Sequence, residues 1–549
     1  MKMRRAEMCI AVFLAVCAGA SATVLHVPGE YATIQAGINA AVDGDTVLVA
    51  DGTYTGDGNR DIDFWGKAIV VMSENGPEAT VIDCEGSASE HHRGFCFHSR
   101  EIPSAVVQGF TIRNGYVARG GGIYSTNDSR PTIIGNTITG NEASEHGGGI
   151  YCDGFWSPVI VGNTIFANVA ACGGGGIACE WSDNTVEGNT IAGNVAGQFG
   201  GGISCEMSTA ILVGNTIKGN TSLIHGGGIS ISGWSAPTIT NNTIAENTAS
   251  IDGGGIHFTG WCFTLIKRNS IDGNSAGRYG GGIYSGNLAT SQALIIGNTV
   301  SGNTAYDGGG ICCHDASPRI RRNTMTGNMA GEYGGAIYSI YSAWPKVGNC
   351  ILWDNGATFA GTEEIAVQYG GGTEISYSDV KGGWLGEGNI DADPQFVHPG
   401  WKDYRLLWGS PCIDSGHPDY LDQDGTRSDM GAFDFDQSKP LVAYLTQQAR
   451  IVHQGETKGV LYTLANCHDQ PRPCWGIVEL ILPGGEPWPG NPLEGPGYGV
   501  MCPRSNWHYV REYEVPVAFP LGTSSFTWKV GVPGNLFDTD TFEFTVVEP

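Results

Sequence analysis

Three carboxylates recur at one position of a motif that is repeated along the middle of the chain. Asp153, Glu180 and Glu206 each stand three residues after the isoleucine of a Gly-Gly-Gly-Ile stretch. If successive copies stack as neighbouring strands about 4.8 Å apart, their charges repel unless a cation or a shared proton relieves them. The motif therefore predicts a strip suited to binding Ca²⁺ or to general acid–base catalysis.

Tryptophans follow several copies of the same motif, in the segment where a turn is expected. Their flat apolar faces are suited to contact with sugar rings, so they are candidate substrate-binding residues: Trp156, Trp181, Trp234 and Trp261. A simpler interpretation is a solvated acidic face beside aromatic side chains that only cover the turns. The carboxylates are candidate catalytic residues only if the protein is an enzyme.

A second acidic group lies near residue 425, in the stretch DQDGTRSD. Asp422, Asp424 and Asp429 flank a glycine turn there. The spacing resembles a small calcium loop but lacks the bidentate glutamate of an EF-hand. Ordinary turn chemistry accounts for such residues as well. We expect no required cofactor, and calcium is the only ion that the sequence suggests.

The elements that must position these residues come from a repeat of 26 to 28 residues. Three markers keep this period: the isoleucine after the glycines (Ile123 to Ile337), a first asparagine (Asn136 to Asn349) and a second asparagine (Asn141 to Asn328). A period of this size indicates a solenoid. Each unit contains three short β-branched segments separated by Gly, Asn and Pro, which are strand signals broken by turn signals. We predict a right-handed parallel β-helix of about a dozen coils, with three short strands in each coil.

Stacking of the coils gives each marker a structural role. Stacked asparagines can pass amide hydrogen bonds along the pile, and asparagine tolerates sharp turns. Strand alternation places the isoleucine inside, the next residue outside, the third inside and the fourth outside. Cys152, Cys179 and Cys205 occupy the third position, where a buried thiol acts as a small apolar side chain rather than a metal ligand.

The residue before the glycines varies from coil to coil between basic, acidic and aromatic types: Arg119, His146, Phe199, His225, Asp252, Tyr279, Asp307 and Tyr333. Such a mixture suits a metal or a glycan, or is only surface decoration. His146 and His225 are three coils apart, about 14 Å by coil rise, so they cannot share one ion.

Charge and the N-terminus indicate an exported protein. The net charge of −26 disfavours nucleic acid and anionic membrane surfaces as partners. Lys2, Arg4 and Arg5 precede a short apolar run, and Ala20-Ser21-Ala22 fits a signal-peptidase site, so cleavage is expected after Ala22. No other segment is long and apolar enough for a membrane span. In an oxidising compartment Cys84 could pair with Cys96, or two of Cys467, Cys474 and Cys502 could pair.

Two stretches carry a resemblance to known families. HVPGEYATIQAGINAAVDGDTVLVADGTYTG, in which Ile34, Ile38 and Ala41 share one helical face, resembles the N-terminal cap of bacterial pectin-lyase-like β-helix proteins. The repeats are similar to the same superfamily, including its NosD-like members. Residues 391–435 closely resemble the terminal segment of surface β-helix proteins of the choice-of-anchor Q type. The resemblance implies a secreted or cell-surface protein.

The resemblance is weaker for activity. Pectate-lyase and polygalacturonase-like β-helices have their active groove along the strand that carries the acidic strip. The chain lacks the Asp-Asp, Gly-His-Gly and Arg-x-Lys elements of polygalacturonases, and the outward positions of that strand offer no Arg or Lys as the base of a lyase.

The sequence thus divides into four parts: a signal peptide (1–22), a cap with the first coil (23–60), the β-helix (61–436) and a separate Ig-like β-sandwich (438–549), where short alternating strands are separated by Gly and Pro. We expect a monomer that binds polysaccharide or cell-surface glycan without catalysis. The alternatives are a polysaccharide lyase or glycoside hydrolase for an acidic polysaccharide, and a purely structural stalk.

Overall fold

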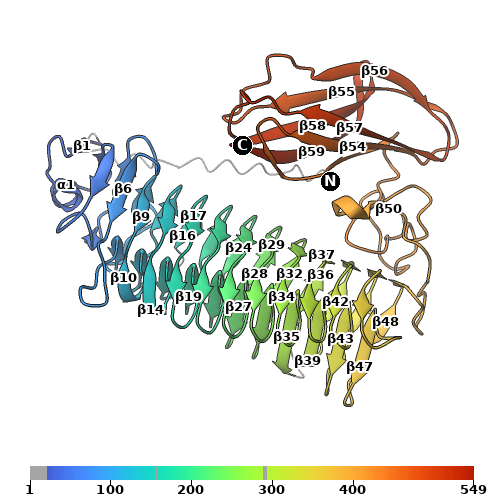
Figure 1. Cartoon of the computed structure of the whole chain (residues 1–549), viewed down its shortest axis with the longest axis horizontal. Coiled ribbons are helices and arrows are strands. Elements are labelled where there is room, and N and C mark those ends of the chain that lie inside the picture. Colours follow the sequence, from blue (N-terminus) through green and yellow to red (C-terminus); the bar gives the residue numbers. More distant parts are fainter. Residues whose placement is uncertain (1–21, 156–157, 289–292) are drawn as a thin grey trace.

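The structure is a computed structural model that describes residues 22–155, 158–288 and 293–549. The predicted signal peptide, apart from Ala22, and the candidate residue Trp156 lie outside these ranges. Figure 1 shows an elongated solenoid that runs from the N-terminal cap to about residue 380, with an antiparallel C-terminal unit beside its distal half.

The solenoid is a parallel β-helix, as predicted. One coil runs through β12 (Thr132–Ile134), β13 (Thr137–Thr139), β14 (Glu142–His146) and β15 (Ile150–Asp153), and each strand pairs in parallel with its counterpart one coil later. The coils thereby build sheets A, B, D and C, of 14, 13, 10 and 12 strands, respectively. Sheet D consists of a fourth strand in most coils, often only two residues long. The sequence pattern predicted three strands in each coil and did not reveal this one.

Sheet A extends from β1 (Val24–Val27) to β48 (Glu374–Ser376), sheet B from β3 (Gly52–Tyr54) to β49 (Asp379–Val380), and sheet D from β10 (Tyr116–Arg119) to β46 (Gly356–Ala357). Sheet C, which carries the glycine motif, comprises β4 (Ile62–Asp63), β7 (Phe95–Phe97), β11 (Ile123–Ser125), β15, β19 (Ile177–Glu180), β23 (Ile203–Glu206), β27 (Ile229–Ser232), β31 (Ile256–Thr259), β35 (Ile283–Leu288), β39 (Ile311–Ala316), β43 (Ile337–Ile340) and β47 (Ile365–Gln368).

The core forms from the predicted inward positions. The motif isoleucines, such as Ile150 and Ile177, are fully buried, and so are the stacked thiols of Cys152, Cys179 and Cys205. Burial raises the pKa of Cys152, and the hydrogen bond with Cys179, followed by burial, raises the pKa of Cys205, so these thiols stay protonated and act as apolar packing. The packing interpretation of the cysteines is confirmed.

The asparagine turns are hydrogen-bonded from coil to coil. Asn163 donates its amide N–H groups to the Ile133 carbonyl at 2.9 Å and to Asn189 Oδ1 at 3.0 Å. Its own Oδ1 accepts the Asn136 backbone N–H at 2.9 Å. The same pattern repeats at the second asparagine, for example at Asn194. These contacts satisfy buried turn backbone, and they confirm the asparagines as scaffold.

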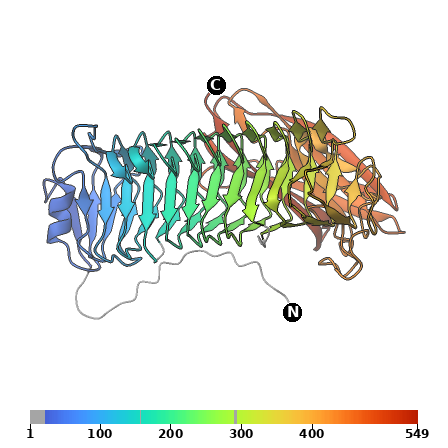
Figure 2. The same cartoon turned by 90° about the horizontal axis from the view of Figure 1, so that it is seen from below.

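A helix covers the N-terminal end of the solenoid (Figure 2). In α1 (Ile34–Ala40) the Thr33 side chain caps the first turn, and Ile34 and Ile38 are fully buried against the first coil. Lys67 Nζ donates to three carbonyls at the helix C-terminus, at 2.7–2.9 Å. The predicted amphipathic cap is thus confirmed, and it protects a sheet edge from pairing with other chains.

After the last coil, the hairpin β50 (Phe396–His398) and β51 (Asp403–Leu406), with the 3₁₀ turn η1 (Pro399–Trp401), leads to two further sheets. One contains β52 (Val442–Gln447), β54 (Thr457–Asn466) and β57 (Ser505–Glu514). The other contains β53 (Ile451–His453), β59 (Asn535–Val547), β58 (Gly522–Val532), β55 (Arg472–Ile481) and β56 (Glu494–Met501). The two sheets share one apolar core, which includes Tyr462, Phe526 and Trp528.

A half-buried ion pair and two hydrogen bonds join the C-terminal unit to the hairpin and the segment after it. Arg405 donates to Asp403 at 2.6 Å and contacts Asp540 of β59 at 2.5 Å. Asn506 exchanges two hydrogen bonds with the backbone of Trp408, at 3.1 and 2.9 Å. Because these contacts come from strands of both C-terminal sheets, the hairpin holds the sandwich through several polar anchors.

Within the described residues, the structure has neither disulfides nor a membrane-spanning helix. The fourteen cysteines there are all free, so the disulfides considered from the sequence are not formed. Within the same ranges, the structure has no helix with the length and apolar character needed to cross a membrane.

Candidate functional site

The acidic strip lies where strand register requires it. Asp153 is paired with Glu180, and Glu180 with Glu206, on neighbouring strands of sheet C. Asp153 and Glu180 are half-buried, whereas Glu206 is exposed. Burial, and then the neighbouring charge of Glu180, raises the pKa of Asp153 above its usual range.

Glu180 is not a free carboxylate, because its two oxygens already have partners. The Tyr151 hydroxyl donates to Oε2 at 2.7 Å, and His146 Nδ1 lies 3.2 Å from Oε1. Arg119 in turn donates to the Tyr151 oxygen at 3.1 Å. The three predicted carboxylates therefore differ from one another: Glu180 belongs to a polar network, Asp153 is half-buried beside it, and Glu206 is exposed to solvent.

The network lies in a corner that the sequence reading did not resolve. Here "the corner" means the residues just before the glycines together with the residues just after the motif isoleucine, where sheet D meets sheet C. The residues before the glycines bridge in parallel, from His146 through Gly173, Phe199, His225, Asp252 and Tyr279 to Asp307. The residues after the isoleucine point out of the helix as expected, yet most are buried: Tyr151, Ala178, Ser230, His257, Tyr284, Cys312 and Tyr338.

A tight glycine turn explains this burial. Gly147 has φ +68°, and a Cβ there would lie 2.5 Å from the Ile150 carbonyl and 2.7 Å from Tyr151 Cβ. Only glycine allows the chain to fold back so closely, and the fold brings His146 beside Tyr151. Most side chains that directly follow the motif isoleucine are therefore covered by their neighbours in the corner rather than by water.

Rings stack along the corner over consecutive coils. Phe199 lies 6.0 Å from His225, His225 lies 4.6 Å from His257, and His257 lies 5.0 Å from Tyr284, measured between ring centroids and with interplanar angles of 26°, 7° and 6°. Further rings continue the stack: Tyr279, His314, Tyr338, Tyr333 and Phe359.

A charged group lies beside this stack. Asp252 is 1% exposed, and Arg278 donates to both of its oxygens, at 2.9 and 2.6 Å. His225 Nδ1 lies 3.5 Å from the same carboxylate, and His257 is adjacent. Sequence reasoning noted His225 and Asp252 as a varied edge but missed His257, because an outward strand position was expected to be solvated. The recurrence of Tyr and His after the isoleucine was the available signal.

The candidate tryptophans are exposed, in the turns that follow sheet C. Trp234 is 70% exposed, Trp181 50% and Trp261 46%, and the rings of Trp234 and Trp261 stack 5.5 Å apart at 9°. The same turns expose further aromatic side chains. Together they form what we call the aromatic row: Trp65, Phe155, Trp181, Trp234, Trp261, Phe263, Tyr341, Trp344 and Tyr369.

The second acidic group is assembled differently from the sequence expectation. Asp422 and Asp429 gather with Asp434, with ligand atoms within 4.8 Å of one another. Asp424 instead accepts the Thr426 and Gln437 backbone N–H groups. Burial raises the pKa of Asp429 to about 7. The predicted role in calcium binding is untested by this geometry and stays a hypothesis.

Arg322 ties this acidic group to the solenoid. Its guanidinium lies 3.1 Å from Asp422 Oδ1 and also contacts Asp434. Asp429 accepts the backbone N–H groups of Asp414 and Phe435, at 2.8 and 2.6 Å. The carboxylates therefore already fasten the terminal segment to the last coils.

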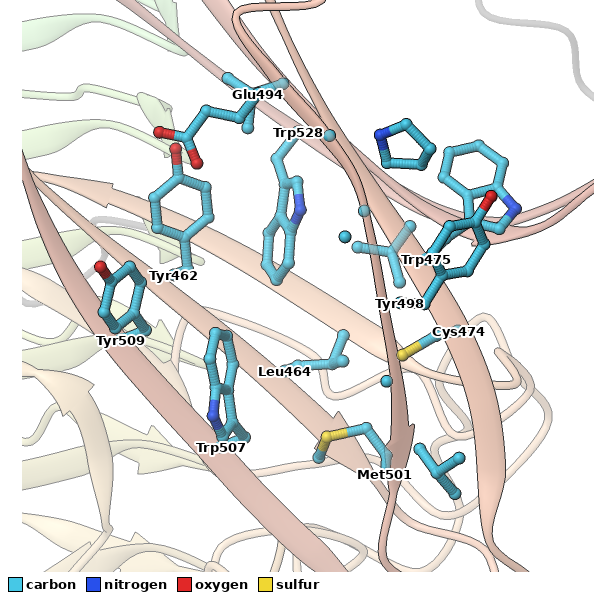
Figure 3. A pocket seen from close by; sticks show the side chains of 18 residues that line it. Tyr462, Leu464, Cys474, Trp475, Glu494, Tyr498, Met501, Trp507, Tyr509 and Trp528 are labelled. Carbon is cyan, nitrogen blue, oxygen red and sulfur yellow. The ribbon is translucent and has the colours of Figure 1, made fainter.

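The C-terminal sandwich has a cavity of about 740 Å³ at its open side (Figure 3). Tyr462 and Trp528 form part of its wall, while Trp507 and Tyr509 line it from β57, the strand beside that of Tyr462, and Tyr498 lies near its edge. Its size and aromatic lining are typical of a small-ligand pocket. Sequence reasoning found this domain but not the cavity, which depends on how far the two sheets separate.

Comparisons with known proteins agree with the solenoid. No curated protein matches the chain. One solved structure, an alkylpurine DNA glycosylase (AlkC) from Pseudomonas fluorescens bound to DNA with an abasic-site analogue, is 14% identical with a TM-score of 0.15. That match covers 20% of this chain and 30% of the glycosylase, and it carries no argument about fold or function. The model of the right-handed β-helix region matches residues 67–244 and 223–380, more than half of the chain. With the stacked coils and asparagine turns, this match shows that the chain belongs to the right-handed, pectin-lyase-like β-helix repeat proteins.

Proposed function

We propose that the protein binds a polysaccharide along the aromatic row. The observation that carries the proposal is the exposure of large aromatic rings in the turns that follow seven of the twelve strands of sheet C, from Trp65 to Tyr369. Exposed apolar surface that extends over several elements marks an interaction site rather than chance. A chain polymer matches this site, since the row is as long as the solenoid.

The chemistry of the row favours a sugar. An indole presents a flat apolar face while its N–H remains free to bond, a combination typical of binding surfaces that are partly wet. Trp234 and Trp261 stack on each other across neighbouring coils, so each ring keeps its outer face for a sugar. The stack restrains both side chains, so less side-chain freedom is lost on binding.

Charge narrows the class of glycan. The acidic strip lies directly beside the row, and the chain carries a net charge of −26. Such a surface repels a polyuronate unless divalent cations bridge the two, and it leaves a neutral polymer unaffected. We therefore propose a neutral polysaccharide as the ligand, bound by an exported or surface-attached protein.

Catalysis at the acidic strip has less support. A glycosidase needs two carboxylates with different tasks on either side of the scissile bond. Glu180 is already held by Tyr151 and His146, and Glu206 has no second free carboxylate opposite it on β27, where Ser232 stands. The arrangement supports a binding face more than a reaction centre.

Affinity electrophoresis in gels that contain neutral glucans, mannans, xylans or polyuronates, with and without calcium, tests the proposal. We expect retardation by at least one neutral polymer, and at least about tenfold weaker binding for the double variant Trp234→Ala/Trp261→Ala. Trp507→Ala, an exposed tryptophan of the sandwich cavity, is the matched control and should bind like the parent.

Three results would contradict the proposal. They are no retardation by any polymer, unchanged binding of the double variant, and loss of binding in Trp507→Ala alone. Release of new reducing ends from a bound polymer would indicate a hydrolase instead.

A further inference from the structure

We infer that His225, Asp252 and His257 form a binding site for one divalent transition-metal ion, with Zn²⁺ as the representative. The site is separate from the aromatic row and does not depend on glycan binding. A nitrogen of each imidazole and an oxygen of the carboxylate lie within 4.8 Å of one another. They come from three neighbouring positions of the corner, on two consecutive coils.

The register of the solenoid creates this group. His225 and Asp252 bridge in parallel as the residues before the glycines, and His257 follows Ile256 on β31, in the same coil as Asp252. The glycine turn between Asp252 and His257 is as tight as at Gly147: a Cβ on Gly253 would lie 2.6 Å from His257 Cβ. The backbone therefore holds the three side chains together without any ligand.

Two unpaired nitrogens indicate what is missing. His257 is 4% exposed, and its Nδ1 has no hydrogen-bond partner. Nδ1 of His225 is also buried and makes no hydrogen bond, although Asp252 Oδ2 lies 3.5 Å from it. A buried polar atom without a partner is costly, so two such atoms beside one carboxylate call for a common partner. A metal ion can accept a lone pair from each ring and one from the Asp252 carboxylate, whose negative charge partly neutralises that of the ion.

The protonation state suits a metal as well. Burial is the main cause that lowers the pKa of both His225 and His257, so both rings are neutral near pH 7 with a free lone pair. Neutral imidazole is the ligand that zinc and its neighbours in the first transition row prefer. Calcium is disfavoured, because it requires six to eight oxygen ligands.

Arg278 supports the carboxylate from the other side. It binds one lone pair of each Asp252 oxygen, and a carboxylate offers about four acceptor positions, so a metal can use another. An outer partner that fixes a ligating carboxylate is common around metal ions. The guanidinium charge also lowers affinity, so we expect moderate rather than very tight binding.

Closure of the site needs only a small movement. In tetrahedral coordination at about 2.1 Å, ligand atoms are roughly 3.4 Å apart. The two stacked rings must tilt so that both lone pairs aim at one ion. Three protein ligands then leave a fourth position for solvent or a solute, as in catalytic rather than structural zinc sites.

The test uses the full-length mature protein without an affinity tag, stripped with a strong chelator and dialysed against Zn²⁺ or Co²⁺ alone. We expect one ion per chain by elemental analysis and visible Co²⁺ bands typical of nitrogen–oxygen ligation. His225→Gln and His257→Gln should each weaken Zn²⁺ binding at least about tenfold and abolish the Co²⁺ bands.

His146→Gln is the matched control, because it removes a histidine from the same corner position three coils away. It should leave stoichiometry and spectrum unchanged. If His257→Gln fails to fold, His225→Gln decides, since its ring lies at the edge of the corner. The inference is overturned if the parent binds no ion, or if both variants retain the ion and its Co²⁺ spectrum, as metal held by Asp422, Asp429 and Asp434 would.

Discussion

Two kinds of turn in each coil, the asparagine turns and the corner between sheets D and C, differ in how their residues vary and how their polar atoms are paired. At the asparagine turns the same residue recurs in coil after coil, and each side chain bonds to the coils before and after it. In the corner between sheets D and C the residue changes at every coil, and unpaired nitrogens remain at His225, His257 and His314.

The comparison separates scaffold from function without any alignment. A residue that is repeated and fully hydrogen-bonded serves the stacking of coils, since every copy solves the same backbone problem. A buried residue that varies, and that leaves polar atoms unpaired, is not explained by stacking. Such residues are expected where a protein gives up stability for binding.

The largest effect should come from a break in the repeated turn. Asn194→Ala removes the acceptor of the Asn168 backbone N–H and the donor to the Ile165 carbonyl, at 3.0 and 2.9 Å. Because both groups stay buried, we expect a loss of about 3–5 kcal/mol in the free energy of unfolding. Chemical denaturation measures this loss.

Asn75→Ala is the control for that experiment. Asn75 is exposed and makes one side-chain bond, to Asp51, so its replacement should cost less than about 0.5 kcal/mol. Equal losses at the two positions would remove the distinction between a stacked asparagine and an ordinary one.

The burial of His257 in the corner should make the free energy of unfolding depend on pH. The pKa of His257 is lowered from 6.5, so below pH 6.5 the unfolded chain takes up a proton that the folded protein excludes. Stability is therefore complete above pH 6.5 and falls as pH decreases, by up to about 1.4 kcal/mol per pH unit. In chelator, the unfolding free energy of the parent should fall more steeply between pH 6.5 and 5 than that of His257→Phe. Parallel curves would show that His257 is not held neutral by burial.

The variant His257→Phe should also differ from the parent in stability at neutral pH. His257→Phe removes an unpaired nitrogen and keeps a ring between His225 and Tyr284, at a position where the next coil already holds the larger Tyr284. We expect a gain of about 1 kcal/mol in chelator, together with the loss of metal binding. A clear loss of stability would place His257 with the scaffold residues.

The smallest effect on stability belongs to the aromatic row. Trp181→Ala removes an exposed ring from a turn, so the free energy of unfolding should change by no more than about 0.5 kcal/mol. Trp181 has φ +52°, and any larger loss would show that its side chain supports that turn. Thermal denaturation measures the stability of this variant, and affinity electrophoresis measures its glycan binding.

The sequence allowed the scaffold to be predicted because one backbone problem recurs in every coil. The period located Ile150, Cys152 and Asn163, and strand alternation gave their faces correctly. Alternation does not say whether an outward face is covered, so the burial of Tyr151 and His257 was missed. That burial depends on the tight glycine turn, whose geometry the letters Gly-Gly-Gly do not specify.

The candidate sites were only partly predictable for a similar reason. The exposed tryptophans follow from their place in the turns, and the register of Asp153 with Glu180 follows from the repeat. The partners of Glu180 could not be predicted, because the repeat gives the positions of Tyr151 and His146 but not their contacts. Asp434 takes the place of Asp424 in a segment that has no repeat.

The decisive experiment is a crystal structure of the protein with a short oligosaccharide of the polymer that retards it most. We predict sugar rings stacked on Trp234 and Trp261, with the sugar chain running along the turns after sheet C. Sugar in the sandwich cavity beside Trp507, with the aromatic row bare, would contradict it.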